Sequence, residues 1–258
     1  MKFQLSIIEK RAISSSRLKK RLNLNKKLGT KDLTKWLFKR YDIRKDDFIL
    51  ELGCGIGSHV IKQSNIVGKK GFILATDYSR DSLNTLKNNL KNRNVNIKCI
   101  SMDEVPIFLK NKKIKFDKII SSYALYYAKN PIRVIKRLSQ FLKKKGKFLI
   151  TAPCYPHTLT EFAKKQKTLK RTAENYIDFS TKKLEPFIKK NRIKNKKYNF
   201  RNILKFKKSD DLLDFYRSTV FYDNKSEKNL ISLFNTTKKK LGYFNIIKSA
   251  KLYKFTVK

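Results

Sequence analysis

Three glycines at every second position follow a short apolar run in the first quarter of the chain. The run Phe48–Leu52 leads directly into Gly53, Gly55 and Gly57. Glycine has no Cβ, so such a loop adopts positive φ angles and lets a ligand lie directly on its backbone. A buried strand, a glycine-rich turn and a helix start form the nucleotide-binding corner of open α/β sheets. The sequence therefore predicts a nucleotide-type ligand at this loop.

Three glycine-loop patterns compete for this segment. The phosphate-binding pattern G-x-x-x-x-G-K-[ST] is absent, because no glycine here starts a run with lysine and a hydroxyl at that spacing. The dinucleotide pattern G-x-G-x-x-G/A matches poorly, because Ser58 stands at its third position. The pattern E-x-G-x-G-x-G is matched at every position by Glu51, Gly53, Gly55 and Gly57.

This last pattern resembles the first motif of the class I S-adenosylmethionine-dependent methyltransferases, and further segments follow in the order of that family. Asp77 ends the second apolar run, Ser101–Asp103 follows the third, and Phe116–Leu125 resembles the fourth strand with its loop. Lys145 stands where the family commonly has proline or glycine in the turn into the fifth strand. The resemblance covers roughly Trp36–Ala152 well and the remainder more loosely.

The resemblance implies S-adenosylmethionine as cofactor and a methyl transfer that needs no metal. Asp77 would hold the ribose hydroxyls, because an ionised carboxylate only accepts hydrogen bonds, and Asp103 would accept from the adenine amine. The loop amides and the following helix N-terminus suit the carboxylate of the cofactor. The residues expected to contact the cofactor are Glu51, Gly53, Cys54, Gly55, Gly57, Asp77, Tyr78, Met102, Asp103 and Ser121.

Simpler roles are open for three of these residues. Glu51 is also placed to pair with a lysine, and Asp77 is also placed to cap a helix. Cys54 is expected to fill the loop as a small side chain and not to act as a nucleophile, because no base is adjacent in sequence.

The segment after the fifth predicted strand holds the candidates for acid–base chemistry. His157 and Glu161 are four residues apart and share a face if a helix starts at Pro156. A histidine oriented by a carboxylate is a candidate general base. The alternative is a surface histidine beside a solvated glutamate.

Several aromatic residues are candidates to contact the methyl acceptor. Tyr123, Tyr126 and Tyr127 follow the fourth predicted strand, with core packing as their alternative role. The segment Ser209–Thr219 resembles the late cap helix of small-molecule methyltransferases. It makes Tyr216 and Arg217 further candidates for acceptor binding.

The order of elements predicts an α/β fold. We expect a Rossmann-like, mostly parallel seven-stranded sheet with helices on both faces and a helical C-terminal cap insert. The domain division would be an N-terminal helical segment 1–45, a cofactor-binding core 46–155 and a C-terminal part 156–258. Strands are expected at Phe48–Leu52, Phe72–Thr76, Asn96–Ile100, Phe116–Ser122, Gly146–Thr151, Phe200–Phe206 and Lys251–Val257. Helices are expected within Ser14–Arg40 and at Ser58–Ser64, Ser79–Lys91, Ile132–Leu142, Pro156–Lys170, Lys182–Lys190, Asp210–Ser218 and Glu227–Leu241.

The chain is strongly basic, with 63 Lys and Arg against 20 Asp and Glu and a formal net charge of +43. Lysine predominates, which a drift toward AT-rich codons explains, whereas phosphate recognition favours arginine. The run Lys189–Arg201 mixes cations with aromatics and is either an RNA-facing patch or a solvated face. Nucleic acid is therefore a partner that is allowed but not favoured.

Scattered cysteines and hydropathy indicate a cytoplasmic protein. Cys54, Cys99 and Cys154 form no paired motif, Met1–Lys10 lacks the apolar run of a signal peptide, and no stretch approaches the ~20 apolar residues that cross a bilayer.

Three functions remain open. The first is a methyltransferase that acts on a small molecule. The second is the same enzyme with an RNA or protein acceptor, and the third is a non-catalytic basic binding protein on the same fold.

Overall fold

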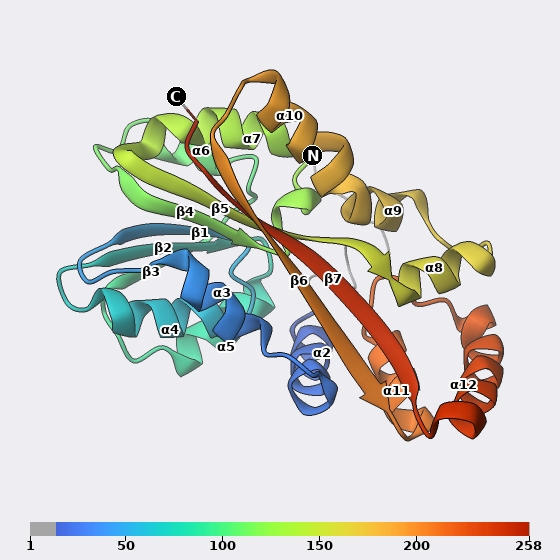
Figure 1. Cartoon of the computed structure of the whole chain (residues 1–258). Helices are drawn as coiled ribbons and strands as arrows, with labels where there is room; N and C mark the ends of the chain where they lie inside the picture. Colours follow the sequence, from blue (N-terminus) through green and yellow to red (C-terminus); the bar gives the residue numbers. More distant parts are fainter. Residues whose placement is uncertain (1–13, 258) are drawn as a thin grey trace, which may run out of the picture.

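A seven-stranded sheet forms the centre of the computed structural model, which describes residues 14–257 (Figure 1). The strand order is β3-β2-β1-β4-β5-β7-β6. The first five strands are parallel, and β7 is antiparallel to both β5 and β6. The strands are β1 Phe48–Leu52, β2 Phe72–Asp77, β3 Val95–Cys99, β4 Phe116–Ser122, β5 Leu142–His157, β6 Asn195–Phe206 and β7 Phe244–Phe255. The predicted mostly parallel seven-stranded sheet is confirmed.

Helices cover both faces of the sheet (Figure 1). One apolar layer joins the sheet to α6, α7 and α10, and the other joins it to α3, α4 and α5. The α-helices are α2 Ser15–Leu28, α3 Leu33–Tyr41, α4 Ser58–Val67, α5 Arg80–Asn89, α6 Val105–Leu109, α7 Pro131–Leu138, α8 Thr158–Lys165, α9 Arg171–Asp178, α10 Glu185–Lys190, α11 Ser209–Arg217 and α12 Glu227–Leu241. Short helical turns are η1 Leu125–Tyr127, η2 Ser139–Phe141, η3 Phe179–Leu184 and η4 Asn224–Ser226.

The continuous apolar run of β1 follows from this two-sided burial. Leu50 and Leu52 face the layer with α7, whereas Ile49 faces the layer with α3, α4 and α5. A strand buried on both faces carries apolar side chains at successive positions instead of alternating with polar ones. The same burial places the end of β1 in the middle of the sheet, where its loop is flanked by β2 and β4.

A second, smaller core lies beyond the main sheet. The hairpin of β6 and β7 extends past the other strands, and α2, α8, α11 and α12 pack around its extension (Figure 1). Its buried side chains are Leu24, Leu159, Phe162, Leu204, Phe206, Leu212, Phe215, Tyr216, Leu230, Phe234, Phe244 and Ile246. Helices α8 to α10 precede β6, and α11 and α12 lie between β6 and β7, so the expected helical C-terminal insert is confirmed.

The N-terminal helical pattern divides into two helices. Gly29 makes an isolated bridge to Leu204 of β6, and Asp32 then caps α3 by accepting from the Lys35 N–H at 2.9 Å. Leu33, Trp36, Leu37 and Tyr41 form the face of α3 that packs on the sheet. The predicted absence of a signal segment at Met1–Lys10 falls outside the described residues.

Two C-terminal expectations for helices are corrected. The helix expected from Pro156 begins at Thr158, because β5 continues to pair with β7 as far as His157. Residues 171–181, for which no helix was expected, form α9 and the first half of the π-helical turn η3, which leads into α10. The last two strands are also longer than expected, because β6 and β7 pair along twelve residues each.

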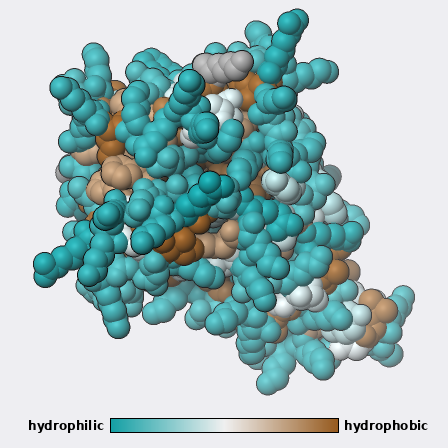
Figure 2. Space-filling view, turned by 60° about the vertical axis from the view of Figure 1, so that its left-hand side comes forward, coloured by the Kyte–Doolittle hydropathy of each residue, from teal (hydrophilic) through white to brown (hydrophobic). Residues whose placement is uncertain are grey.

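Hydrophilic side chains dominate the surface. Figure 2 shows one face on which they surround smaller apolar patches. Among the described helices, none is both long and apolar enough to span a membrane.

One carboxyl group is buried in the layer beneath α4. Glu51 is only 2% exposed, and its Oε2 accepts from Gln63 Nε2 at 2.8 Å. Burial raises the pKa of Glu51 to about 8, although the hydrogen bond from Gln63 opposes the shift. Gln63 Oε1 has no hydrogen-bond partner among the described residues, and a protonated Glu51 places an O–H donor beside this amide. Glu51 is therefore neutral at neutral pH in the folded protein.

We expect the Gly57→Ala substitution to destabilise the fold strongly. Gly57 precedes α4 with φ +81°, and an added Cβ would lie 2.1 Å from Leu86 Cδ1, which is buried on α5. Backbone strain and this overlap should together lower the free energy of unfolding by about 2–4 kcal/mol in urea denaturation. Gly242→Ala is the matched control, because Gly242 has φ +78° and open space around the added atom. Equal losses in the two variants would contradict the packing against Leu86.

We expect Glu51→Gln to change how stability depends on pH. The folded-state pKa of about 8 lies above the model value of 4.5, so the folded state binds the extra proton between these values. The free energy of unfolding therefore falls as pH rises toward 8, with a slope of up to about 1.4 kcal/mol per pH unit from this group. Urea denaturation from pH 5 to 9 should show this slope in the wild type and in the exposed control Glu104→Gln, and its loss in Glu51→Gln. An unchanged slope in Glu51→Gln would show that Glu51 is not the group responsible.

Candidate cofactor and acceptor site

The glycine loop is held against the end of β2. The N–H groups of Gly53 and Cys54 both donate to Thr76 O, at 2.8 and 3.0 Å. Gly53 and Gly55 have φ angles of +70° and +55°, a region that L side chains rarely adopt. An added Cβ on Gly53 would lie 2.3 Å from Ala124 Cβ and 2.9 Å from Met102 Cε. The alternating glycines are thus required by the course of the loop.

Asp77 joins the glycine loop to the turn after β2. Its Oδ2 accepts from the Gly55 N–H at 2.7 Å and its Oδ1 accepts from the Ser79 N–H at 2.8 Å. Burial raises the pKa of this carboxyl, and the donors from Ser79, Gly55 and Tyr78 oppose the shift. The helix-capping alternative does not hold for Asp77, because Ser79 caps α5. Its carboxylate faces the loop, where the ribose role would require it.

The turns after β2 and β3 supply the other expected cofactor contacts. Tyr78 is exposed beside an open groove of about 740 Å³. Asp103 accepts from the backbone N–H groups of Lys129 and Asn130, at 3.0 and 3.3 Å, and so ties this turn to the loop before α7. Met102 packs next to Gly53. The groove is lined by Tyr78, Arg80, Cys99, Ile100, Ser101, Glu104, Ile107 and Phe108.

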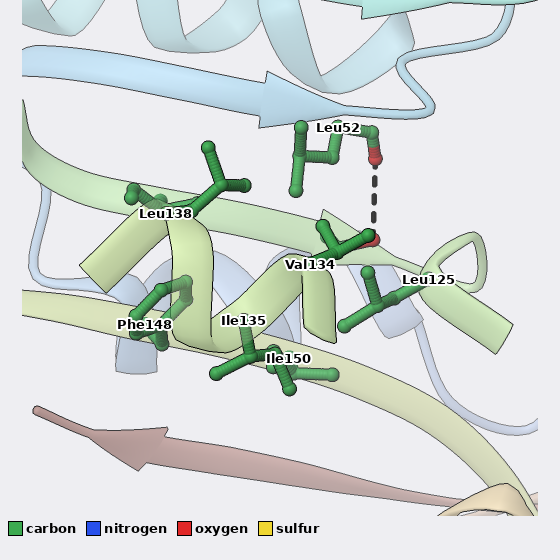
Figure 3. Close-up of a pocket in the computed structure, with 9 residues that line it drawn as sticks. Leu52, Leu125, Val134, Ile135, Leu138, Phe148 and Ile150 are labelled. Carbon is green, nitrogen blue, oxygen red and sulfur yellow. Dashed lines mark hydrogen bonds between the residues drawn. The ribbon is translucent and has the colours of Figure 1, made fainter. Parts of the chain in front are cut away.

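Two of the expected cofactor residues are turned into the interior. The carboxyl of Glu51 faces Gln63 beneath α4. Ser121 is 1% exposed, and its hydroxyl donates to Leu52 O at 3.2 Å. It belongs to an apolar cluster under α7. Figure 3 shows Leu52, Leu125 and Val134 of this cluster. For either side chain to contact the cofactor, it would have to turn out of the interior. In this structure the two residues support the loop through their backbone.

The Cys54 thiol is protonated in this loop. Burial raises its pKa well above the usual value, and the nearby carboxylates of Asp77 and Glu51 raise it further. Because the thiolate is the nucleophilic form, this environment agrees with a space-filling role for Cys54.

A tyrosine cluster lies at the carboxyl end of β4. The ring centroids of Tyr126 and Tyr127 are 4.6 Å apart, and Tyr176 of α9 lies 5.2 and 4.5 Å from them. Tyr123, just before them, has φ +56° and donates its N–H to Thr151 O at 2.9 Å. A positive φ at a bulky residue is a strained conformation of the kind that concentrates at functional sites. Tyr176 was not predicted from the sequence, because α9 was not expected.

The expected pairing of His157 with Glu161 is corrected by the structure. Glu161 accepts from the backbone N–H of His157 at 3.4 Å, whereas the imidazole Nδ1 lies 3.1 Å from the Thr160 hydroxyl. The ring is 5% exposed and packs on Phe221. Burial lowers the pKa of His157 to about 3, and the positive charge of Lys248 lowers it further. His157 is thus a neutral, buried imidazole and not a surface histidine.

The polar groups of Tyr216 and Arg217 bond to residues of the second core and its helices, and not to the tyrosine cluster. Tyr216 is fully buried in the second core, and its hydroxyl accepts from the Asp223 N–H at 3.0 Å. Arg217 makes a two-point ion pair with Glu227, with both distances 2.7 Å, which ties α11 to α12. Their contact with an acceptor stays a prediction, and in this structure the helix that carries them packs in the second core.

Sequence reasoning missed the inner face of α2. Leu18 Cδ2 is the one described atom within 4 Å of an added Cβ on Gly55, at 3.0 Å, so α2 covers the glycine loop. Arg21 Nη1 donates to Ser218 O at 2.7 Å, and Lys248 of β7 donates to Asn25 Oδ1 at 3.0 Å. The sequence carried one signal for this face. Arg17 and Arg21 lie one helical turn apart, and they are two of only 13 arginines in a chain whose cations are mostly lysines.

The arrangement fits the cofactor that the motifs imply. Three positive-φ glycines expose loop backbone, a carboxylate stands at the end of β2, and an open groove adjoins the next turn. No group of three or more His, Cys, Asp or Glu side chains within residues 14–257 is arranged to hold a metal ion.

Comparisons with known proteins agree with this geometry. A family described as a methyltransferase domain matches residues 43–208. The ubiquinone/menaquinone biosynthesis C-methyltransferase of Wigglesworthia glossinidia brevipalpis is 29% identical over 120 residues, which cover 46% of this chain and 47% of that protein. A probable cobalt-precorrin-6B C(15)-methyltransferase of Saccharolobus solfataricus is 30% identical over 112 residues, which cover 43% and 54%. The chain thus spans about half the length of the curated relatives it matches.

Solved structures share the fold at low sequence identity. The YcgJ protein of Bacillus subtilis has a TM-score of 0.61 and 14% identity, with 87% of this chain and 98% of that chain covered. A SAM-dependent methyltransferase of Aquifex aeolicus has a TM-score of 0.51 and 15% identity, with 99% and 100% covered. Because the family match extends over more than half of the sequence, the chain belongs to the methyltransferase-domain family of class I S-adenosylmethionine-dependent enzymes, with S-adenosylmethionine as cofactor.

Proposed function

We propose that this chain transfers a methyl group from S-adenosylmethionine to an oxygen, nitrogen or carbon atom of a small molecule. The observation that carries the proposal is the gathering of aromatic side chains at the carboxyl edge of the sheet. Phe221 packs on His157 at the end of β5 and with the tyrosine cluster after β4, and the nearby Ser218 carbonyl accepts from Arg21 of α2. A partly aromatic site that helices cover suits a small acceptor better than a polymer.

The curated relatives support the same class of acceptor. Both are named as C-methyltransferases of small-molecule biosynthesis, one for ubiquinone and menaquinone and one for a cobalt-precorrin. Neither name identifies the acceptor of this chain, because the similarity covers only about half of each relative. The atom that receives the methyl group is left open by these similarities.

The contribution of the protein would be positional. Bound S-adenosylmethionine supplies an electrophilic methyl group on a sulfonium. The backbone of Gly53, Gly55 and Gly57 would support its methionine end, and the Asp77 carboxylate would hold the ribose hydroxyls. The turn with Tyr78, Met102 and Asp103 would border the adenine. Holding a nucleophile in line with the methyl group supplies most of the rate enhancement in such a transfer.

Proton removal from the acceptor would fall to His157 if a base is used. The imidazole is neutral at physiological pH, because burial lowers its pKa to about 3. One ring nitrogen bonds Thr160, so only the other is available to an acceptor. A base with so low a pKa suits an acceptor whose own proton is acidic.

An RNA or protein acceptor fits less well. The basic run Lys189–Arg201 forms the end of α10 and the first half of β6. Strand β6 is the edge strand of the sheet, and β4, β5 and β7 separate it from β1 and the glycine loop. Lys197 is also paired, at 3.2 Å, with Glu185. A polymer bound along the run would therefore lie at the edge of the sheet and not over the glycine loop.

The non-catalytic alternative lacks support in the loop. A decayed site tolerates side chains at former glycine positions, whereas here all three glycines keep positive φ angles and Asp77 keeps its contacts. A cytoplasmic location is part of the proposal, because Cys54, Cys99 and Cys154 are all free thiols.

Asp77→Asn tests the cofactor site directly. The amide keeps the size of the side chain but loses the charge and one acceptor oxygen. We expect affinity for S-adenosylhomocysteine, measured by calorimetric titration, to fall about tenfold or more.

Asp81→Asn is the matched control for this experiment. Asp81 is exposed in the first turn of α5, so the control makes the same charge change near the site without touching the loop. Its affinity should equal that of the wild type. Wild-type affinity in Asp77→Asn as well would remove the proposed ribose role.

A further inference from the structure

Three cations lie on α2 and β7, near the carboxyl edge of the parallel strands. Arg17 and Arg21 are four residues apart on α2 and share its inner face with Leu24 and Leu28, which pack into the second core. Lys248 of β7 approaches the same helix through its hydrogen bond to Asn25. Helix α2 itself contacts β6, α11 and α5, so this face spans from the second core to the cofactor side.

These cations have no carboxylate partner within residues 14–257. Arg17 Nη1 is buried and makes no hydrogen bond to any described residue. Arg21 donates to the neutral carbonyl of Ser218, and Lys248 donates to the neutral amide of Asn25. The ion pairs that the structure shows involve other lysines and arginines. An uncompensated cation held away from water costs free energy unless a counterion completes the site.

The charges affect one another and their neighbours. Burial lowers the pKa of Lys248 to about 7, and the positive charge of Arg21 lowers it further. Lys248 in turn lowers the pKa of His157. Burial raises the pKa of the Tyr127 phenol, and the guanidinium of Arg21 opposes that shift. The geometry agrees, because Lys248 is the strand partner of His157 and its hydrogen bond to Asn25 places it one helical turn from Arg21. Val220 and Phe221, just after the Ser218 carbonyl that Arg21 contacts, pack with the tyrosine cluster.

We propose that Arg17, Arg21 and Lys248 form the binding site for an anionic head group, a carboxylate or a phosphate, carried by the methyl acceptor. The inference rests on the proposed function and narrows its acceptor to an anion. An arginine fork binds either group through two parallel hydrogen bonds, and a lysine adds a point charge.

The neighbouring side chains indicate the rest of the acceptor. Tyr126 and Tyr127 pack with Val220 and Phe221, just after the Ser218 carbonyl that Arg21 contacts. Phe221 also packs against His157, at 5.1 Å between ring centroids. Aromatic walls next to a cationic end favour an acceptor with a flat, apolar body and one charged terminus. The glycine loop lies under Leu18, one residue from Arg17, so the head group would be held near the cofactor end of the site.

The first test uses simple probes of this chemistry. The full chain, saturated with S-adenosylhomocysteine, is titrated calorimetrically with benzoate, with phenyl phosphate and with neutral benzamide at one fixed ionic strength. We expect at least one of the two anions to bind about tenfold or more tightly than benzamide. Equal binding of all three probes, or no binding by either anion, would overturn the proposal.

Substitutions assign the effect to these side chains. Arg21→Gln and Lys248→Met should each weaken the anion about tenfold or more, with affinity for S-adenosylhomocysteine changed less than about threefold. Lys26→Gln, on the exposed side of the same helix, is the matched control and should leave the anion affinity unchanged. An equal loss in Lys26→Gln would mean that only the general positive field is sensed. If Arg21→Gln and Lys248→Met lose affinity for S-adenosylhomocysteine but keep their affinity for the anion, the two cations bind the cofactor and the proposal is wrong.

Arg17→Met gives a readout that a purely structural role would not produce. Arg17 is half-buried, and its Nη1 is buried without a hydrogen-bond partner among the described residues. Removing this cation should raise the melting temperature of the free protein while weakening the binding of the anion. A lowered melting temperature together with unchanged anion binding would exclude Arg17 from the site. Failure of the wild type to bind S-adenosylhomocysteine would instead refute the proposed function, and the anion titrations would then be read on the free protein.

Discussion

The hydrogen bond from the Gly55 N–H to the Asp77 carboxylate is the contact on which the site depends. It joins the loop after β1 to the turn after β2 and holds the loop in positive-φ conformations that only glycine adopts readily. The carboxylate is kept in place by a second donor, from Ser79, while burial opposes its charge. A ribose would compete with or extend these hydrogen bonds, so the same group that shapes the loop would also recognise the ligand.

A second constraint comes from the length of the last two strands. Because β6 and β7 pair over twelve residues each, they extend beyond the parallel strands and require a core of their own. Helices α2, α8, α11 and α12 provide it, and this brings α2 across the glycine loop and Lys248 beside His157. The covering of the glycine loop by α2 is therefore a consequence of hairpin packing. It also concentrates positive charge, because the helix that closes the site carries Arg17 and Arg21 on its inner face.

Local patterns predicted the parallel half of the sheet well, because β1, β2 and β4 are short runs buried on both faces. The segment Phe116–Ser122 was predicted with its observed bounds, and the glycine loop followed from residue types alone. The C-terminal half was less predictable. His157 was expected on a helix, but long-range pairing with Lys248 keeps it in β5 and turns its ring toward Thr160. The ion pair of Arg217 with Glu227 and the closing role of α2 likewise depend on contacts between distant segments, which local periodicity does not encode.

The central claim is that the loop and Asp77 form a site for S-adenosylmethionine. Calorimetric titration of the full chain with S-adenosylmethionine, S-adenosylhomocysteine and NAD tests it most directly. Micromolar binding of the first two ligands with no binding of NAD is the predicted result. Binding of NAD alone, or of none of the three by protein that circular dichroism shows to be folded, would contradict the account.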